Sequence, residues 1–129
     1  MGNIYQKAEL TDCELTTMKI VWDAEEPITC PEIISILSSK YGLNYKDTTV
    51  YTFLKNLKDK GFVDSYRKGI TFFVPLRSEE EYRTEVIKHE EKFWFNGDFF
   101  EFIVALGEIN DIDPSDLEKL KKMHKKYVK

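Results

Sequence analysis

The chain has 129 residues, 42% hydrophobic and 33% charged, and its net charge is −4. This length suits one ordinary domain, or a small domain with an appended helical element. No apolar run approaches the roughly 20 residues that span a bilayer, and the N-terminus has neither the basic nor the apolar region of a signal peptide, so we expect a cytoplasmic protein with no membrane partner.

The distribution of charge matters more than its sum. The net negative charge alone argues against a nucleic-acid-binding protein. Between Lys40 and Lys68, however, seven basic residues stand against three acidic ones, while the remainder holds twelve basic and twenty acidic residues. Because charges farther apart than about 8 Å are largely screened at physiological salt, this basic stretch can bind phosphates despite the acidic remainder.

Two capping boxes of the form Ser/Thr-x-x-Glu, at 11–14 and 29–32, predict the starts of two helices after a loosely held arm at 1–10. Residues 23–27 separate these helices, and the second ends near 40–42. Cys13 and Cys30 lack metal-ligand spacing, so we interpret them as free thiols. The apolar stripes of the two helices are Leu15, Met18 and Trp22, and Ile33, Ile36 and Leu37.

A third helix is predicted from Lys46 to Gly61, where the glycine ends it. Val50, Leu54 and Leu57 share one stripe that must be buried. The remaining faces carry hydroxyls near the N-terminus and lysines further along, an order typical of a helix that enters a DNA groove. We expect Thr48, Thr49, Tyr51 and Thr52 near bases, and Lys46 and Lys55 on phosphates; an ordinary solvated face is the alternative for an isolated segment.

The pattern then changes to that of a β-hairpin. Residues 62–66 and 70–74 are rich in β-branched and aromatic side chains and flank Arg67-Lys68-Gly69. Behind a helix that enters a DNA groove, the two basic residues of this turn are expected to contact the flanking phosphate backbone or the minor groove; a simple solvated turn is the alternative. The predicted fold is therefore mainly α with a small β-hairpin, a winged helix-turn-helix DNA-binding domain at 1–77 followed by a helical dimerisation domain at 78–129.

The C-terminal region is helical and unusually aromatic. A third capping box at 78–81 precedes Tyr82, Val86, His89 and Phe93, and six of the ten residues from 93 to 102 are aromatic. Gly97 is expected to separate two helices, and Asp113-Pro114 to begin the last one, which carries Leu117, Leu120, His124 and Tyr127 on one side.

About 50 residues in short helices form a poor core alone, so we expect a homodimer; folding back onto the winged domain is the alternative. The expected dimer contacts are Val86, Phe93, Trp94, Phe99, Phe102, Ile103, Leu106, Leu117 and Leu120.

Nothing in the sequence indicates an enzyme or a cofactor. The glycines form no phosphate-binding loop. His89 and His124 lie on or beside apolar stripes without Cys, Asp or Glu in metal-ligand spacing, so we interpret them as packing residues and expect no metal site.

The sequence resembles the BlaI/MecI/CopY family of bacterial repressors from about Leu10 to Tyr127. The similar stretches are L-T-D-C-E-L-T-T-M-K-I-V-W from Leu10, T-T-V-Y-T-F-L-K-N-L-K-D-K-G from Thr48, F-V-P-L-R-S-E-E-E-Y from Phe73 and F-N-G-D-F from Phe95. The resemblance implies a dimer of winged-helix domains on operators with dyad symmetry, with Thr49 and Thr52 facing the groove and Val50 structural. The chain departs from the family at Thr48, at Lys46-Asp47 and at Ile70, so phosphate contacts of the wing must come from Arg67 or Lys68.

The resemblance also bears on how repression is relieved. The paired C-x-C motifs of the copper-responsive branch are missing, so a copper sensor is not expected. The β-lactam branch is cleaved at an Asn-Phe bond by a protease; here no such pair exists and the matching place reads Ala105-Leu106. An inactivating protease is a further expected partner.

Two other functions fit parts of the sequence. The acidic composition suits a winged-helix protein-interaction module that binds no DNA. The aromatic cluster suits, less well, a small-molecule sensor.

Overall fold

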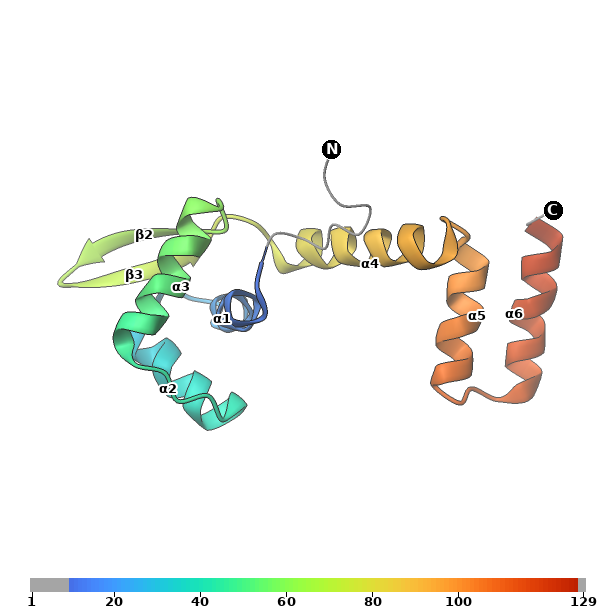
Figure 1. Ribbon diagram of the computed structural model, residues 1–129, viewed down its shortest axis with the longest axis horizontal. Coiled ribbons are helices and arrows are strands. Elements are labelled where there is room, and N and C mark those ends of the chain that lie inside the picture. The colour runs from blue at the N-terminus through green and yellow to red at the C-terminus, as the bar shows by residue number, and fades with distance from the viewer. Residues whose placement is uncertain (1–9, 128–129) are drawn as a thin grey trace. The chain divides into compact units, whose positions relative to one another are not determined.

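The structure, a computed structural model, describes residues 10–127 and side chains to Lys126, so most of the predicted N-terminal arm lies outside the described residues. The elements are α1 (Asp12–Asp23), β1 (Ile28–Thr29), α2 (Cys30–Tyr41), α3 (Asp47–Asp59), β2 (Val63–Lys68), β3 (Ile70–Pro75), α4 (Glu79–Phe95), α5 (Phe99–Ile109) and α6 (Pro114–Tyr127) (Figure 1). They form two compact units: a winged unit that ends at Arg83 and a C-terminal unit that begins at Thr84. The domain boundary between 77 and 78 stays a prediction. Among the described helices, none has the length and apolarity to cross a membrane.

Both predicted capping boxes of the winged unit are confirmed. Thr11 Oγ1 accepts from the backbone N–H of Glu14 at 3.2 Å, and the Glu14 carboxylate accepts from the Thr11 N–H at 3.1 Å. Thr29 and Glu32 make the same reciprocal pair at the start of α2. Each box satisfies helix N–H groups that have no partner within the helix. The starts of α1 and α2 therefore follow from local sequence.

The sheet differs from the predicted two-stranded hairpin in having a third strand. β1 pairs antiparallel with β3, with Ile28 opposite Phe73, and the strand order is β1-β3-β2. A two-residue strand has no periodicity of its own, so only its pairing reveals it. The hairpin turn is also tighter than predicted: β2 extends to Lys68, which pairs with Ile70 across Gly69 at φ +77°.

The core of the winged unit lies between its three helices and the sheet. The face that α1 buries is rotated from the predicted stripe: Glu14, Thr17, Met18 and Val21 are buried, whereas Leu15 and Trp22 are half-buried. Trp22 lies at the edge because its Nε1–H donates to the Arg77 carbonyl at 2.8 Å. Tyr82, which is 4% exposed, packs on the rings of Trp22 and Phe62 and fixes the start of α4 in this core.

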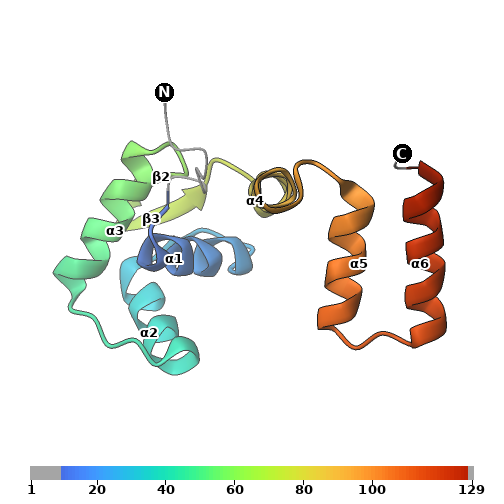
Figure 2. The ribbon, with the colours of Figure 1, turned by 45° about the vertical axis from the view of Figure 1, so that its right-hand side comes forward.

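The C-terminal unit contains the rest of α4 and a pair of antiparallel helices, α5 and α6 (Figure 2). Gly97, at φ +81°, ends the turn between α4 and α5, as predicted. A Cβ at Gly107 of α5 would lie 2.7 Å from Ile112 Cδ1, so glycine allows the close approach of the loop that leads to α6. Of residues 84–126, Gly107 alone is buried. This unit by itself therefore encloses almost no apolar core.

Candidate nucleic-acid interface

The helix α3 presents one face to solvent and anchors the other in the core. Val50, Leu54 and Leu57 are at most 1% exposed, which confirms the predicted buried stripe. The ring of Phe53 makes an edge-to-face contact with Tyr45 at 5.3 Å, in the segment that joins α2 to α3. Because three side chains and an aromatic pair fix its rotation, α3 holds its outer face in one orientation.

The N-terminal turn of α3 carries the first predicted base-contacting residues. Lys46 is the N-cap and makes no side-chain capping bond, and the Thr48 N–H donates to Asp47 Oδ1 at 2.8 Å. Thr48 is exposed, whereas Thr49 is half-buried. A helix N-terminus carries partial positive charge, which favours an approaching phosphate. This end of α3 thus combines a cationic side chain, the exposed Thr48 and a favourable dipole.

Thr52 lies one turn further along the exposed face. Its Oγ1–H donates to the Thr48 carbonyl at 3.0 Å, a bond within the helix. A hydroxyl has one hydrogen and two acceptor lone pairs, so this bond uses the hydrogen, and the lone pairs and methyl group of the exposed Thr52 stay available. Thr52 therefore presents an acceptor and an apolar group to a ligand.

Tyr51 is 45% exposed, and the Cys30 thiol at the start of α2 lies in its electrostatic range. Burial raises the pKa of Tyr51, with further contributions from the neighbouring Cys30 thiol and from Asp47. Arg67 opposes this shift, which places the guanidinium of the wing in the electrostatic range of α3. Tyr51 therefore offers exposed aromatic surface beside the N-terminal turns of α3.

Lys55, which is predicted to contact a phosphate, and Lys58, which is not, differ in how they are held. Lys55 forms an exposed ion pair with Asp59 at 3.4 Å. Lys58 Nζ donates to Ser65 Oγ at 2.8 Å and so ties α3 to β2. Exposed ion pairs are weak, so Lys55 can exchange its partner for a phosphate at little cost.

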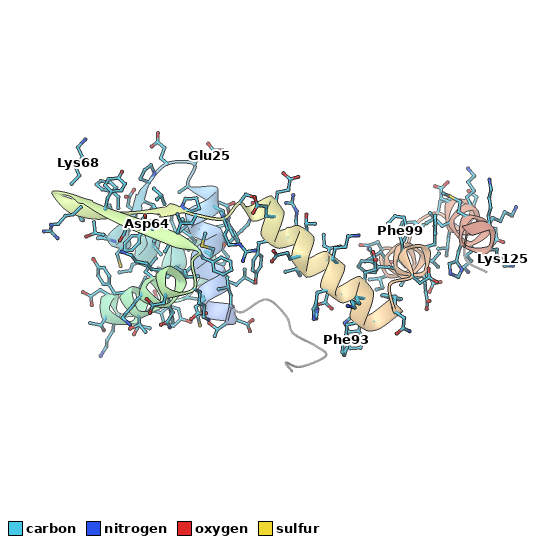
Figure 3. The ribbon with its side chains drawn as sticks, turned by 90° about the horizontal axis from the view of Figure 1, so that it is seen from above. Glu25, Asp64, Lys68, Phe93, Phe99 and Lys125 are labelled. Carbon is cyan, nitrogen blue, oxygen red and sulfur yellow. The ribbon has the colours of Figure 1, made fainter. Side chains whose placement is uncertain are left out.

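The wing ends in the two predicted basic residues. Arg67 and Lys68 are exposed at the end of β2, and Lys68 lies at the tip of the hairpin (Figure 3). Tyr66 stacks on Phe72 at 5.5 Å, which stiffens the two strands behind the tip. The structure thus gathers the residues predicted for DNA contact on α3 and the neighbouring wing, from Lys46 to Lys68.

One residue pair that supports this surface was not predicted. Glu14, 3% exposed, accepts a hydrogen bond from Lys60 Nζ at 2.6 Å, which connects the first turn of α1 to the C-cap of α3. Burial by itself raises the pKa of Glu14, but the hydrogen bonds from Lys60, from the Thr11 N–H and from Asn56 outweigh it and leave the pKa below its ordinary value. The sequence predicted only the capping role of Glu14.

A hollow lies beside the N-terminus of α3. It is lined by Ile34, Ser35, Ser38, Ser39, Asn44, Tyr45 and Lys46. Ser38 Oγ donates to Asn44 Oδ1 at 2.7 Å, so part of this polar lining is already ordered. The hydroxyls and Lys46 extend the polar surface of α3 onto α2.

The residues predicted for dimerisation lie on three helices of the C-terminal unit. Trp94, Phe99 and Leu106 are 63%, 53% and 44% exposed. The others are half-buried: Val86, Phe93, Phe102, Ile103, Leu117 and Leu120. None of the nine is covered by this chain to the degree expected of a core residue.

Comparison with solved structures gives partial similarity. The monomeric form of Bacillus licheniformis BlaI, solved with the blaP half-operator, is 27% identical, with 60% of this chain and 92% of that chain covered and a TM-score of 0.48. Lactococcus lactis ZitR is 21% identical, with 95% of this chain and 75% of that chain covered and a TM-score of 0.43. Its structure in complex with DNA is 19% identical, with coverages of 95% and 76% and a TM-score of 0.44. No curated protein matches the chain.

The family comparison is decisive. The family model described as penicillinase repressor matches residues 10–126, which is nearly the whole chain. This match confirms the resemblance noted from the four sequence stretches, and it confirms that the protein is not an enzyme. The chain belongs to the penicillinase repressor family of DNA-binding, winged-helix transcriptional repressors.

Proposed function

We propose that the protein represses transcription as a homodimer that reads a dyad-symmetric DNA operator. The observation that carries the proposal is the exposed face of α3 beside a wing with a cationic tip. A helix of this shape fits the major groove of B-DNA, and a neighbouring hairpin then meets the flanking backbone.

The base contacts are assigned to Thr48, Thr49, Tyr51 and Thr52. Because the Thr52 hydrogen is used within α3, its oxygen would accept from an adenine or cytosine amino group, or its methyl group would contact a thymine methyl. The ring of Tyr51 would add apolar contact. Each good contact contributes about 1–3 kcal/mol of discrimination between bases.

The phosphate contacts are assigned to Lys46, Lys55, Arg67 and Lys68. Lys46 adds its charge to the positive end of α3, and the last two residues lie at the end of the wing. Phosphate contacts fix the register of a protein on DNA but carry no sequence information. These four residues would therefore set the position from which α3 reads bases.

The homodimer is proposed from the C-terminal unit. Gly107 is its one buried residue in the range 84–126, while Trp94, Phe99 and Leu106 are exposed. Large exposed apolar patches mark interaction sites. A second copy of the same helices would cover these side chains and would place two copies of α3 on two half-sites.

Relief of repression by regulated proteolysis belongs to the same proposal. Cleavage within the helical domain at 78–129 would separate the dimer contacts from the winged domain. After cleavage, each winged domain would bind one half-site alone, with half of the DNA contacts of the dimer. A cleaved protein would therefore bind the operator much more weakly.

A selection from random duplex DNA tests this function. The purified full chain is mixed with a duplex library, bound molecules are recovered and amplified over several rounds, and the enriched sequences are aligned. We expect an inverted repeat with half-sites about one helical turn apart, 10–10.5 base pairs between centres, or a multiple of it.

A control library bound by the Thr49→Ala/Thr52→Ala protein separates reading of bases from general affinity. That variant keeps every basic residue but should enrich the repeat weakly. If the wild-type chain, shown to be folded and dimeric, enriched no sequence, the proposal would fail, and the protein-interaction module would become the better hypothesis.

A further inference from the structure

Three side chains with metal-ligating atoms converge within the C-terminal unit. They are Asp98 and Glu101 at the start of α5 and His124 in the last turns of α6. One ligand atom from each lies within 4.8 Å of the other two. The group is therefore built from two helices that run side by side (Figure 2), and it combines an imidazole with two carboxylates.

The two oxygens of Asp98 have different partners. Oδ1 accepts the Glu101 N–H at 3.0 Å and so caps α5, whereas Oδ2 lies 2.9 Å from His124 Nε2. A cation bound to Oδ2 would leave the cap intact. Asp98 can thus serve as a helix cap and as a ligand at the same time.

The three residues also differ in exposure and in the contacts that hold them. The side chains of Asp98 and His124 are 18% and 32% exposed and are held by their mutual contact. Glu101 is exposed, and only its backbone N–H is engaged by the cap. Two donors are therefore positioned, and a third can swing toward them.

The donor set matches one class of ion. Zinc binds imidazole nitrogen at 2.0–2.1 Å and carboxylate oxygen at about 2.0–2.2 Å, so tetrahedral ligands lie about 3.4 Å apart. Asp98 Oδ2 and His124 Nε2 are 2.9 Å apart, so a bound ion would replace their hydrogen bond and move them about 0.5 Å apart, and the third ligand atom lies within 4.8 Å of both. Magnesium, which prefers six oxygens and keeps its waters, fits a site with an imidazole poorly.

We propose that Asp98, Glu101 and His124 bind one divalent transition-metal ion of the zinc type, with water in the remaining position. The ion would join the first turn of α5 to the last turns of α6. Sequence spacing gave no such site because Asp98 and His124 are 26 residues apart. The proposal concerns the C-terminal unit alone, so its outcome is independent of operator binding.

Calorimetric titration of the full chain with zinc chloride tests the site. We expect one ion per chain, with magnesium chloride giving no comparable binding. Glu101→Gln and His124→Gln should each weaken zinc binding at least about tenfold, a loss of the size seen when the surroundings of a metal site are altered. The matched controls, Glu108→Gln on the same helix and His89→Gln, should bind as wild type.

NMR of the histidine ring nitrogens gives a second readout, which zinc would not change if His124 had only a structural role. In NMR spectra, zinc should shift the resonance of His124 Nε2 and leave His89 unchanged. Should His124→Gln fail to fold, Glu101→Gln decides, because it retains the backbone cap of α5. Zinc binding that is absent, equal for magnesium, or unchanged in Glu101→Gln would overturn the proposal.

Discussion

Lys60 Nζ donates to Glu14 Oε1 at 2.6 Å, and this bond joins the C-cap of α3 to the first turn of α1. Glu14 also closes the capping box of α1, so one nearly buried carboxylate serves the start of α1 and the end of α3. A buried carboxylate of this kind is stabilising only while its hydrogen-bond donors remain. The orientation of α3 is therefore linked to the charge of Glu14.

Replacing Glu14 by Gln should lower the free energy of unfolding of the winged unit by about 1.5–3 kcal/mol at neutral pH, the range for a hydrogen bond to a charged group. The pKa of Glu14 is depressed in the folded protein, so its contribution is fully present above the pKa of the unfolded chain, about 4.3. It is lost as the pH falls through the folded pKa. The difference between wild type and Glu14→Gln should therefore shrink below about pH 4.3.

Urea unfolding followed by tryptophan fluorescence measures this effect. The Trp94→Phe background leaves Trp22, which packs on the buried Tyr82 at the edge of the core of the winged unit, as the single tryptophan. Glu118→Gln, an exposed carboxylate of α6, is the control and should change little. A difference that stays constant from pH 7 to pH 3 would mean that the charge of Glu14 does not contribute.

The sequence predicted what local signals determine. Both capping boxes, the buried stripe of α3 and the glycines at 61 and 97 depend on residues a few positions apart, and all are found. Such signals act through bonds within one turn of helix, which is why a single sequence reveals them.

What the sequence did not predict depends on contacts between distant residues. Ile28 becomes a strand because Phe73 lies opposite it, and Glu14 can be buried on α1 because Lys60, 46 residues away, supplies its charged partner. The Asp98 and His124 pair is a third such case. For the site, the sequence therefore identified which residues face outward on α3, but not the packing that holds α3 in place.

Thr52 allows the hydroxyl and the methyl group to be tested separately. Thr52→Val keeps the apolar bulk and removes both the acceptor and the bond to the Thr48 carbonyl, whereas Thr52→Ala removes the methyl as well. If Thr52 accepts from a base, both variants should lose about 1–3 kcal/mol of operator affinity. If it contacts a thymine methyl, Thr52→Val should bind nearly as wild type and only Thr52→Ala should weaken.

Fluorescence anisotropy with the selected operator gives these affinities. A duplex of scrambled sequence should bind all three proteins equally, because phosphate contacts are unchanged. Equal affinity of both variants and wild type for the operator would remove Thr52 from the assigned base contacts.

Loss of the basic tip of the wing should change the salt dependence of binding. Arg67→Ala removes one assigned phosphate contact from each protomer, so the slope of log affinity against log salt should fall in magnitude by about 2 for a dimer. Affinity should weaken to a similar degree on all DNA sequences. Lys88→Ala, an exposed lysine of α4, is the control.

Titrations at several salt concentrations also separate the repressor from a protein-interaction module. A dimer that neutralises several phosphates loses affinity steeply with salt. If binding to DNA were insensitive to salt, or the slope were unchanged in Arg67→Ala, the assignment of Arg67 to a phosphate would be wrong.

A charge on the exposed apolar surface of α5 should separate the dimer. Phe99 and Leu106 are 53% and 44% exposed in one chain, so an aspartate at either position is solvated in a monomer but would be buried without a partner between two copies. We expect Phe99→Asp and Leu106→Asp to be monomeric at micromolar concentration with unchanged helical content.

Sedimentation equilibrium measures the mass, and circular dichroism measures the helix content. Ser115→Asp, exposed in the first turn of α6, is the control and should remain dimeric. A monomeric wild type, or dimers of both aspartate variants as stable as wild type, would contradict the proposed interface.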